Sequence, residues 1–529
     1  MGDGGLFRIS CQGWKNSCLT LYIIILLHNF FFSAYITLPI DRFDIFRYNN
    51  HGYFNMKENR GLRKTLEQQR SNQTPASNSE KLGTMPVGKL LLSMALPMII
   101  AMIIQALYNV VDSIYVAKIS ENALTAVSLA FPMQTLMIAF STGLGVGINS
   151  MVSRSLGEGD HKKAGHVALN GIFLIALVVI GFTLVGIFGS RAFIASQTDI
   201  PEIFEGGTTY VSICLILCCF QFFEITLERL LQATGRTLDT MISQGVGAVI
   251  NIIFDPILIF GYFGFPKMGI AGAAAATVFG QFVACVLALV FNLWHNKELS
   301  FSFRGFRPRW SILKLILAIG VPSVIMQAIG SVMIFGMNRI LMSFVSTAAA
   351  VFGVYFKLQS IVFMPVFGLN NGMVPIIAYN YGARHKDRMV HTMKLAVLTA
   401  VVMMLVGLCI MQLFPAQMLL LFEAEENMLA IGVPALKTLS LSFIFAGFCI
   451  VISSVFQALG FGIYSLLVSF VRQIIVLLPV AYLLSLSGDV NMVWWAFPIA
   501  EIATVLCCLL FLRRVNRKVL KPMEKAVTA

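Results

Sequence analysis

Charged residues are scarce in this chain of 529 residues. Only 12% of the residues are Asp, Glu, Lys or Arg, whereas 57% are hydrophobic and the mean hydropathy is +0.81. A soluble globular domain carries about 25% charged residues. The composition therefore excludes a soluble globular protein and predicts an integral membrane protein that crosses the bilayer repeatedly.

Signs of metal or enzyme chemistry are also lacking. Eight of the ten Cys residues lie inside apolar runs, without His or Cys partners at the spacing of metal ligands. We interpret these cysteines as small hydrophobic residues, so neither a structural metal site nor a disulfide framework is expected. The sequence contains no His-containing metal cluster, nucleophile elbow or phosphate loop, so we expect neither an enzyme nor a cofactor.

Apolar runs long enough to cross a bilayer as helices make up most of the chain. Charged or turn-rich breaks such as RSLGEGDHKK and NYGARHKDR separate most neighbouring runs. Twelve runs are found, at residues 90–116, 123–150, 165–188, 207–233, 240–263, 269–293, 312–337, 349–378, 391–414, 432–459, 463–485 and 492–512. The predicted fold is an all-α integral membrane protein with twelve transmembrane helices.

The net charge of +13 is distributed unevenly among the loops. Lys and Arg are concentrated in the loops after runs 2, 6, 8 and 12, whereas the opposite loops are neutral or acidic, for example at Asp199, Glu202 and Glu205. This pattern indicates a multi-pass protein of the cell membrane with both termini in the cytoplasm. The basic residues orient the chain in the lipid bilayer, so a nucleic-acid partner is not expected.

An internal repeat divides the chain into halves. Residues 86–240 superpose on residues 311–465 without a gap. The coinciding residues include Pro97 with Pro322, Gly143 with Gly368, Gly147 with Gly372, Gly157 with Gly382, and QATG at 232–235 with QALG at 457–460. Because each half holds an even number of runs, we predict two pseudo-symmetric six-helix bundles around a central cavity, as in alternating-access transporters. The predicted domains are an N-lobe (86–300), a C-lobe (301–515) and a basic cytoplasmic tail (516–529).

Residues 1–85 differ from the rest and are predicted to be an N-terminal extension without fixed structure. Residues 19–40 could form a signal-like or additional spanning segment, although His28 and Asn29 interrupt it, and residues 67–83 have the polarity of a tether. Since Met56 or Met85 would be a sensible start before the first strong run, we favour an upstream over-extension of the reading frame. The mass of the purified protein would test this.

Acidic residues inside the runs need a reason, because each costs about 2.5 to 3.5 kcal/mol at the bilayer centre. Asp112 lies on run 1, and Asn251 and Asp255 lie four residues apart on run 5, so that the amide and the carboxylate share one helix face. The runs of the second half carry no carboxylate before Glu501. The residues that the repeat places opposite the two aspartates are Met337 and Val480. We therefore expect any proton or cation chemistry to belong to the N-lobe.

Structural interpretations of these polar residues stay open. The acids could pair with buried bases, but the clear basic candidates within runs lie in the second half, at Arg339, Lys357 and Arg472. Glu228 adjoins Arg229 near the expected cytoplasmic end of run 4, which favours a local ion pair or snorkelling. Thr277 could hydrogen-bond to its own helix. Gln134 and Gln359, which the repeat superposes, are interpreted as hydrogen-bonding residues between helices.

Further residues are candidates for the substrate path. We place Gln105, Tyr108 and Glu224 in the substrate cavity, together with Met and Phe side chains that the sequence does not identify individually. Pro97 and Pro256 interrupt the backbone hydrogen bonding of runs 1 and 5, so both are candidate hinges.

Three stretches are similar to a known family. KLLLSMALPMIIAMIIQALYNVVDSIYVAKISENALTAVSLAFP, LLQATGRTLDTMISQGVGAVINIIFDPILIF and GIAGAAAATVFGQ together resemble the multidrug and toxic compound extrusion (MATE) family. The resemblance covers essentially all of residues 85–515. It combines the proline and aspartate of run 1, the Asn-x-x-x-Asp-Pro of run 5, the alanine-rich start of run 6 and the YNYGAR after run 8.

The resemblance implies a V-shaped, two-lobed antiporter that exports organic, often cationic or aromatic compounds in exchange for Na+ or H+. In the DinF-like subgroup with an N-lobe cation site, the ligands carry over onto Asp112, Asn251, Asp255 and Thr277. Other members place acids in spans 7 and 10, which lack them here, so a C-lobe site of that kind is not expected.

Two rival functions follow from the same residues. A flippase for lipid-linked anionic precursors would use the intramembrane bases of the second half, and a non-transport membrane protein would have no obvious use for the duplication. We rank a monomeric drug exporter first. The sequence does not choose between Na+ and H+.

Overall fold

The structure is a computed structural model that describes residues 79–299, 301, 306–422 and 424–523. The chain divides into two units, residues 1–74 and 75–529, and every described residue belongs to the second. The predicted extension therefore lies mostly outside the described residues. Its last part is ordered, because Glu80–Thr84 forms the short helix α3.

All regular structure in the described residues is helical. Ten helical segments are each long and apolar enough to cross a membrane. Two further spans each consist of two shorter helices, which meet at a bend of 44° in one pair and 48° in the other. The elements are α3 (Glu80–Thr84), α4 (Val87–Ala117), α5 (Glu121–Gly157), α6 (His161–Ala195), α7 (Pro201–Ile216), α8 (Cys219–Ala233), α9 (Thr237–Phe260), η1 (Tyr262–Gly264), α10 (Ile270–Trp294), α11 (Trp310–Met342), α12 (Ser346–Gly382), α13 (Lys386–Leu413), α14 (Pro415–Leu420), α15 (Glu426–Ser440), α16 (Phe443–Ala458), α17 (Gly462–Phe470), η2 (Val471–Leu477), α18 (Leu478–Ser485), α19 (Val490–Val493), α20 (Ala496–Val515) and η3 (Asn516–Leu520). The predicted all-α membrane fold is confirmed, with twelve spans when each bent pair counts as one.

The two bent pairs, α7 with α8 and α15 with α16, correct the sequence prediction, which treated each as a continuous run. They break at equivalent places, since residues 217–218 and 441–442 lie about one repeat apart. The break carries no change in polarity, so hydropathy alone does not register it.

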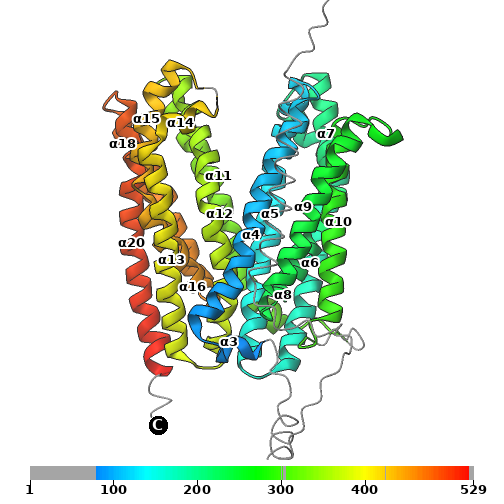
Figure 1. The fold of residues 1–529 in the computed structure, drawn as a ribbon, viewed down its shortest axis with the longest axis vertical. Helices are drawn as coiled ribbons and strands as arrows, with labels where there is room; N and C mark the ends of the chain where they lie inside the picture. Colours follow the sequence, from blue (N-terminus) through cyan, green and yellow to red (C-terminus); the bar gives the residue numbers. More distant parts are fainter. Residues whose placement is uncertain (1–78, 300, 302–305, 423, 524–529) are drawn as a thin grey trace, which may run out of the picture. The chain divides into compact units, whose positions relative to one another are not determined.

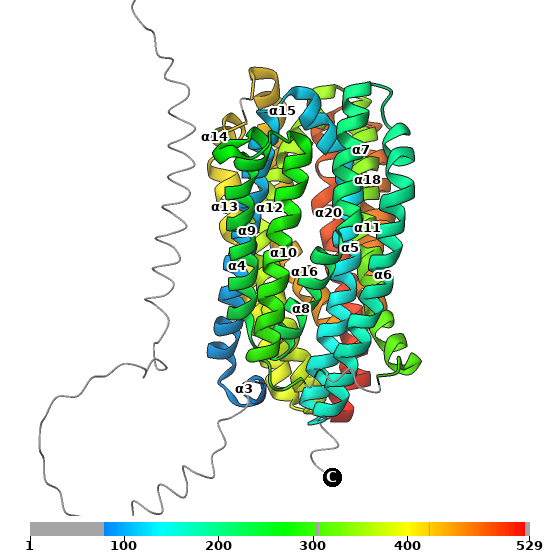
Figure 2. The ribbon, with the colours of Figure 1, turned by 90° about the vertical axis from the view of Figure 1, so that its right-hand side faces the viewer.

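The described residues form two helical bundles, one from α4–α10 and the other from α11–α20. Figure 1 shows the bundles diverging toward the end that carries α7, α15 and α18, and Figure 2 shows the same helices from the side. Two hydrophobic clusters lie mainly one in each bundle, with Phe222 in the first and Phe352, Phe443 and Trp494 in the second. Each cluster also includes side chains from the first helix of the opposite bundle, α11 in the first and α4 in the second.

Four helices make most of the contact between the bundles. α4 packs along α12, α11 packs along α5, and α5 packs against α12. α4 and α11 are the first helices of their halves, so each packs on the second helix of the opposite half. α4 also packs against α9 of its own bundle, and it therefore touches both lobes.

Local sequence explains where these helices begin and end. The Ser120 side chain accepts a hydrogen bond from the Ala123 N–H at the start of α5, and Asp160 does the same for Lys163 in α6. Gly261 ends α9 in the left-handed conformation, with a φ of 79°. Pro97 and Pro256 lie inside α4 and α9, both of which continue past the proline, so their roles as hinges stay predictions.

Candidate functional site

The polar residues predicted on runs 1, 5 and 6 lie together between α4, α9 and α10. Asp255 is fully buried, and Asn251 is 3% exposed. The Asn251 amide can donate to Asp255 Oδ2 at 3.3 Å while its oxygen accepts from the Thr277 N–H at 3.2 Å. With the amide turned over, its nitrogen instead donates to Thr277 Oγ1 at 3.3 Å. In both orientations Asn251 connects α9 with Thr277 of α10.

Asp112 of α4 completes this group. Its carboxyl group lies within hydrogen-bonding reach of the Asp255 carboxyl group. The Oδ1 atoms of both aspartates are buried and have no hydrogen-bond partner among the described residues. Two adjacent buried carboxylates repel each other unless a proton or a cation lies between them. The four residues Asp112, Asn251, Asp255 and Thr277 offer oxygen atoms for such an ion, and we call them the N-lobe acidic site.

The bases of the second half, suggested as structural partners, do not reach these acids. Arg472 is paired with Glu501 at 3.2 Å within the C-lobe. Arg339 and Lys357 are exposed, and the Lys357 ammonium lies 5.8 Å from the centre of the Phe422 ring. The aspartates are therefore not held by any of the three.

A cavity adjoins the N-lobe acidic site. Its volume is about 130 Å³, which is room for several water molecules. All three predicted cavity residues line it, as do Asn251 and Thr277. The complete lining is Met98, Met102, Gln105, Tyr108, Ile138, Thr142, Gln221, Glu224, Ile225, Glu228, Arg229, Gln232, Gln244, Gly247, Ala248, Asn251, Thr277, Gly280, Gln281 and Asn371.

Two charged residues of the cavity correct the sequence interpretation. Glu228 and Arg229 do not snorkel, because they are only 5% and 9% exposed. Arg229 Nη1 donates to Gln232 Oε1 at 2.9 Å and to Asn371 Oδ1 at 2.8 Å. Since Asn371 belongs to α12, Arg229 connects the two lobes at the cavity. The available signal was an Arg inside an apolar run, three residues before the Gln232 of the repeated QATG.

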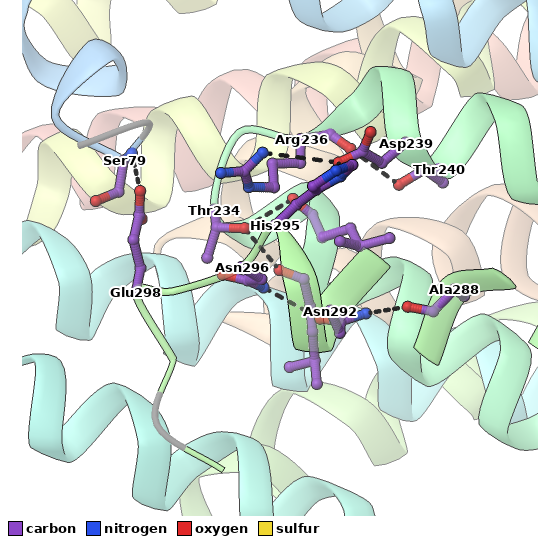
Figure 3. Close-up of polar contacts among 12 residues, drawn as sticks. Ser79, Thr234, Arg236, Asp239, Thr240, Ala288, Asn292, His295, Asn296 and Glu298 are labelled. Carbon is purple, nitrogen blue, oxygen red and sulfur yellow. Dashed lines mark hydrogen bonds and ion pairs between the residues drawn. The ribbon is translucent and has the colours of Figure 1, made fainter. Parts of the chain in front are cut away.

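Hydrogen bonds from α9 and α10 hold this part of α8 in place. Figure 3 shows Asn292 donating to Ala288, and the same amide also donates to the Leu227 carbonyl at 2.9 Å, next to Glu228. Glu228 itself accepts from Ser243 Oγ at 3.2 Å. Asp239, at the start of α9, lies 3.1 Å from His295 Nδ1. These contacts fix α8 against α9 and α10.

Outcomes differ for the remaining predictions. Gln134 donates to the Tyr210 hydroxyl at 3.1 Å, which confirms a bond between helices for that residue. Thr277 interacts with Asn251 rather than with its own helix. Met337, the counterpart of Asp112, is fully buried in an apolar environment. No group of three or more His, Cys, Asp or Glu side chains able to hold a metal occurs among the described residues.

Duplicated six-helix bundles around a polar cavity define the class of membrane transporters with two internal repeats. A sequence profile of the MatE family matches residues 97–257 and 322–483, which together make up more than half of the chain. The chain therefore belongs to the MatE family of transporters and is not an enzyme. The two matched segments begin at residues 97 and 322, which are the prolines that the internal repeat superposes.

Curated relatives and solved structures agree with this family. The Multidrug export protein MepA of Staphylococcus haemolyticus is 26% identical over 421 residues, which cover 78% of this chain and 90% of the relative. MepA of Staphylococcus aureus is 24% identical over 435 residues, with 80% and 93% coverage.

Among solved structures, a MATE protein in complex with MaL6 has a TM-score of 0.79 and 25% identity, covering 85% of this chain and all of its own. A transporter of the MOP superfamily from Pyrococcus furiosus has a TM-score of 0.79 and 24% identity, covering 86% of this chain and all of its own. The reverse polarity of the binding pocket in that transporter suggests a different function for it.

Proposed function

We propose that this protein is a cation-coupled antiporter that exports small organic, often cationic or aromatic compounds from the cytoplasm by alternating access. The observation that carries the proposal is the contact between Asp112 and Asp255, two acids without a basic partner in the described part of the chain, beside a polar cavity. The curated relatives are named as multidrug export proteins, which supports the same function.

The coupling ion binds at the N-lobe acidic site. A proton on one aspartate, or Na+ among the oxygen atoms of Asp112, Asn251, Asp255 and Thr277, neutralises the repulsion between the acids. Inward movement of one charge gains about 2.3 kcal/mol per 100 mV of membrane potential, which is enough to bias the exchange. Because Asn251 and Thr277 also line the cavity, the ion and the substrate compete for neighbouring positions.

α4 transmits the binding event to the other lobe. Its outer part carries Asp112, which contacts Asp255. Its inner part packs on α12, where Ala95 and Ile99 lie directly against Gly372 and Gly368. A shift of α4 after neutralisation therefore alters the contact between the lobes, and Pro97 lies within the segment that makes this contact.

The substrate occupies the cavity beside Gln105, Tyr108 and Glu224, where a carboxylate and an aromatic ring suit an organic cation. The protein resides in the cell membrane as a monomer, with both termini in the cytoplasm. The bases that motivated a flippase for anionic precursors, Arg339, Lys357 and Arg472, are absent from the cavity lining. The base that does line the cavity, Arg229, donates to Gln232 and Asn371, and the same lining carries the acids Glu224 and Glu228.

Transport in proteoliposomes tests this proposal. Ethidium movement is measured under a Na+ gradient and under a pH gradient, each applied alone, for the wild type, Asp112→Asn and Asp199→Asn. Asp199 is an exposed acid outside the spans and is the matched control. We expect one gradient to drive transport by the wild type and the control but not by Asp112→Asn. Transport by Asp112→Asn at the wild-type rate would contradict the coupling site.

A further inference from the structure

The two lobes touch each other through glycines that the repeat makes equivalent. Gly157 ends α5 and Gly382 ends α12, and the repeat superposes the two. A Cβ atom at Gly157 would collide with the Tyr379 carbonyl oxygen, and one at Gly382 would collide with the Arg154 carbonyl oxygen. The repeat also superposes Arg154 on Tyr379, so the two contacts are pseudo-symmetric copies. Both neighbours are backbone atoms, so the two helices approach as closely as glycine permits.

The same pattern recurs at two levels nearer the cavity. A Cβ at Gly143 would lie 2.8 Å from the Val324 nitrogen, and one at Gly368 would lie 2.7 Å from the Ile99 nitrogen. At the next level, a Cβ added at Gly147 would lie 2.6 Å from the Ile316 carbonyl oxygen. A Cβ added at Gly372 would lie 2.7 Å from the Ala95 nitrogen. Contacts of backbone against glycine therefore extend from the cavity toward the loops that are rich in Lys and Arg.

Charged side chains surround the contact at Gly157 and Gly382, which lies furthest from the cavity. The Arg154 guanidinium lies 4.7 Å from the centre of the Tyr381 ring across the lobe boundary. The same Arg154 pairs with Glu158 at 3.0 Å, and Lys163 pairs with Glu158 at 2.6 Å. Arg154 thus links the end of α5 to the end of α12. Replacing Arg154 by a shorter neutral residue would weaken this contact without the steric clash that a larger residue at Gly157 or Gly382 would introduce.

We propose that the crossing of α5 and α12 at Gly157 and Gly382 is the cytoplasmic gate of the transporter. The cavity residue Thr142 precedes Gly157 on α5 by about four helical turns, and Asn371 precedes Gly382 on α12 by about three. Access from the cytoplasm therefore requires these two helix ends to separate. The inference rests on the alternating access of the proposed function, and it adds the segment that must open.

Thiol accessibility tests the gate without any drug. Ile138, which lines the cavity, is replaced by Cys in a background whose native cysteines are Ala or Ser. A membrane-impermeant maleimide is applied to inside-out and to right-side-out vesicles. Gly157→Ala and Gly382→Ala each add a methyl group where only backbone lies. We expect labelling from the cytoplasmic side to rise about tenfold, because overpacking of this size shifts a two-state equilibrium by such a factor. Labelling from the outside should fall.

Gly353→Ala is the matched control, because it lies on α12 with nothing within 4 Å of the added Cβ. Its labelling should equal that of the parent. Unchanged labelling in both gate variants would overturn the proposal, as would a rise from both sides, which indicates local unfolding. If the glycine variants do not fold, the Arg154→Gln variant is labelled in the same way. More labelling from the cytoplasmic side than in the parent supports the gate, and labelling equal to that of the parent refutes it. If the wild type transports nothing under either gradient, the proposed function fails while this measurement still reports on the gate.

Discussion

Replacing Asp255 by Asn separates the ion-binding role of the N-lobe acidic site from its structural role. Asn has the same shape, and the amide introduced at this position can donate to the neighbouring Asp112 carboxylate, whose Oδ1 atom has no partner among the described residues of the wild type. The substitution removes one of two adjacent buried charges. We therefore expect the Asp255→Asn variant to insert and fold, with a free energy of unfolding in the absence of Na+ at least equal to that of the wild type.

The response to the coupling ion should disappear in the same variant. An ion that binds only the folded protein stabilises it by about 2.7 kcal/mol at a concentration of 100 times its Kd. For a protein of this size, that corresponds to a rise of a few degrees in Tm. With one carboxylate left, the site loses half of its negative charge, and we expect most of this rise to be lost together with efflux.

Thermal unfolding of the purified protein in detergent measures both effects. NaCl is exchanged for choline chloride at constant ionic strength, and the series is repeated at several pH values. The exposed-acid variant Asp199→Asn should behave as the wild type. A Na+ response in the wild type assigns Na+ as the coupling ion, and a response to pH alone assigns H+. Asp255→Asn with an undiminished ion response and full efflux would refute the reasoning.

Three further variants test contacts described above. Arg229→Gln loses the charge that donates to Asn371 across the lobes at 2.8 Å; we expect efflux, measured as initial rates in proteoliposomes, to fall by about tenfold or more. Glu501→Gln leaves Arg472 without its carboxylate, which costs up to about 3 kcal/mol. Thermal unfolding should show a lower Tm that Arg472→Leu in the same chain partly restores. Partial burial raises the pKa of Glu158, but hydrogen bonds from Lys163 and Arg154 outweigh this and hold the pKa below its usual value. Its contribution to stability is therefore complete above the usual pKa and is lost as the pH falls through the lowered one, so Glu158→Gln should flatten the loss of Tm in acid. Thermal unfolding from pH 7 down to about pH 2.5, which includes the usual carboxyl pKa of about 4.3 and the range below it, would reveal this.

The arrangement of the N-lobe acidic site was predictable because two of its residues share one helix. A spacing of four residues places Asn251 and Asp255 on the same face whatever the fold. Asp112 and Thr277 came from the family resemblance and from the cost of an acid in the bilayer, and the structure brings them to the same place. Neither argument depends on long-range packing.

Arg229 could not be assigned in this way. Its partner Asn371 lies 142 residues away and on the other lobe. An Arg next to a Glu in the sequence suggests a local ion pair, but in the structure Arg229 bonds instead to two amide oxygens. The glycines of the repeat were visible in the sequence, yet their meaning required the structure, because a glycine reports neither which helix approaches it nor how closely.

The duplication, together with its asymmetry at Asp112 and Met337, supports the proposal that one ion site drives both lobes. α4 and α11 contact the opposite lobe in the same way, through Ile99 on Gly368 and Val324 on Gly143. Only α4 carries an acid further along, because its equivalent on α11 is the buried Met337. In the proposed mechanism, the ion therefore acts on one of two otherwise matched contacts. Since the lobes meet through both contacts, a shift at the α4 contact would change the crossing of α5 and α12 without a second ion site.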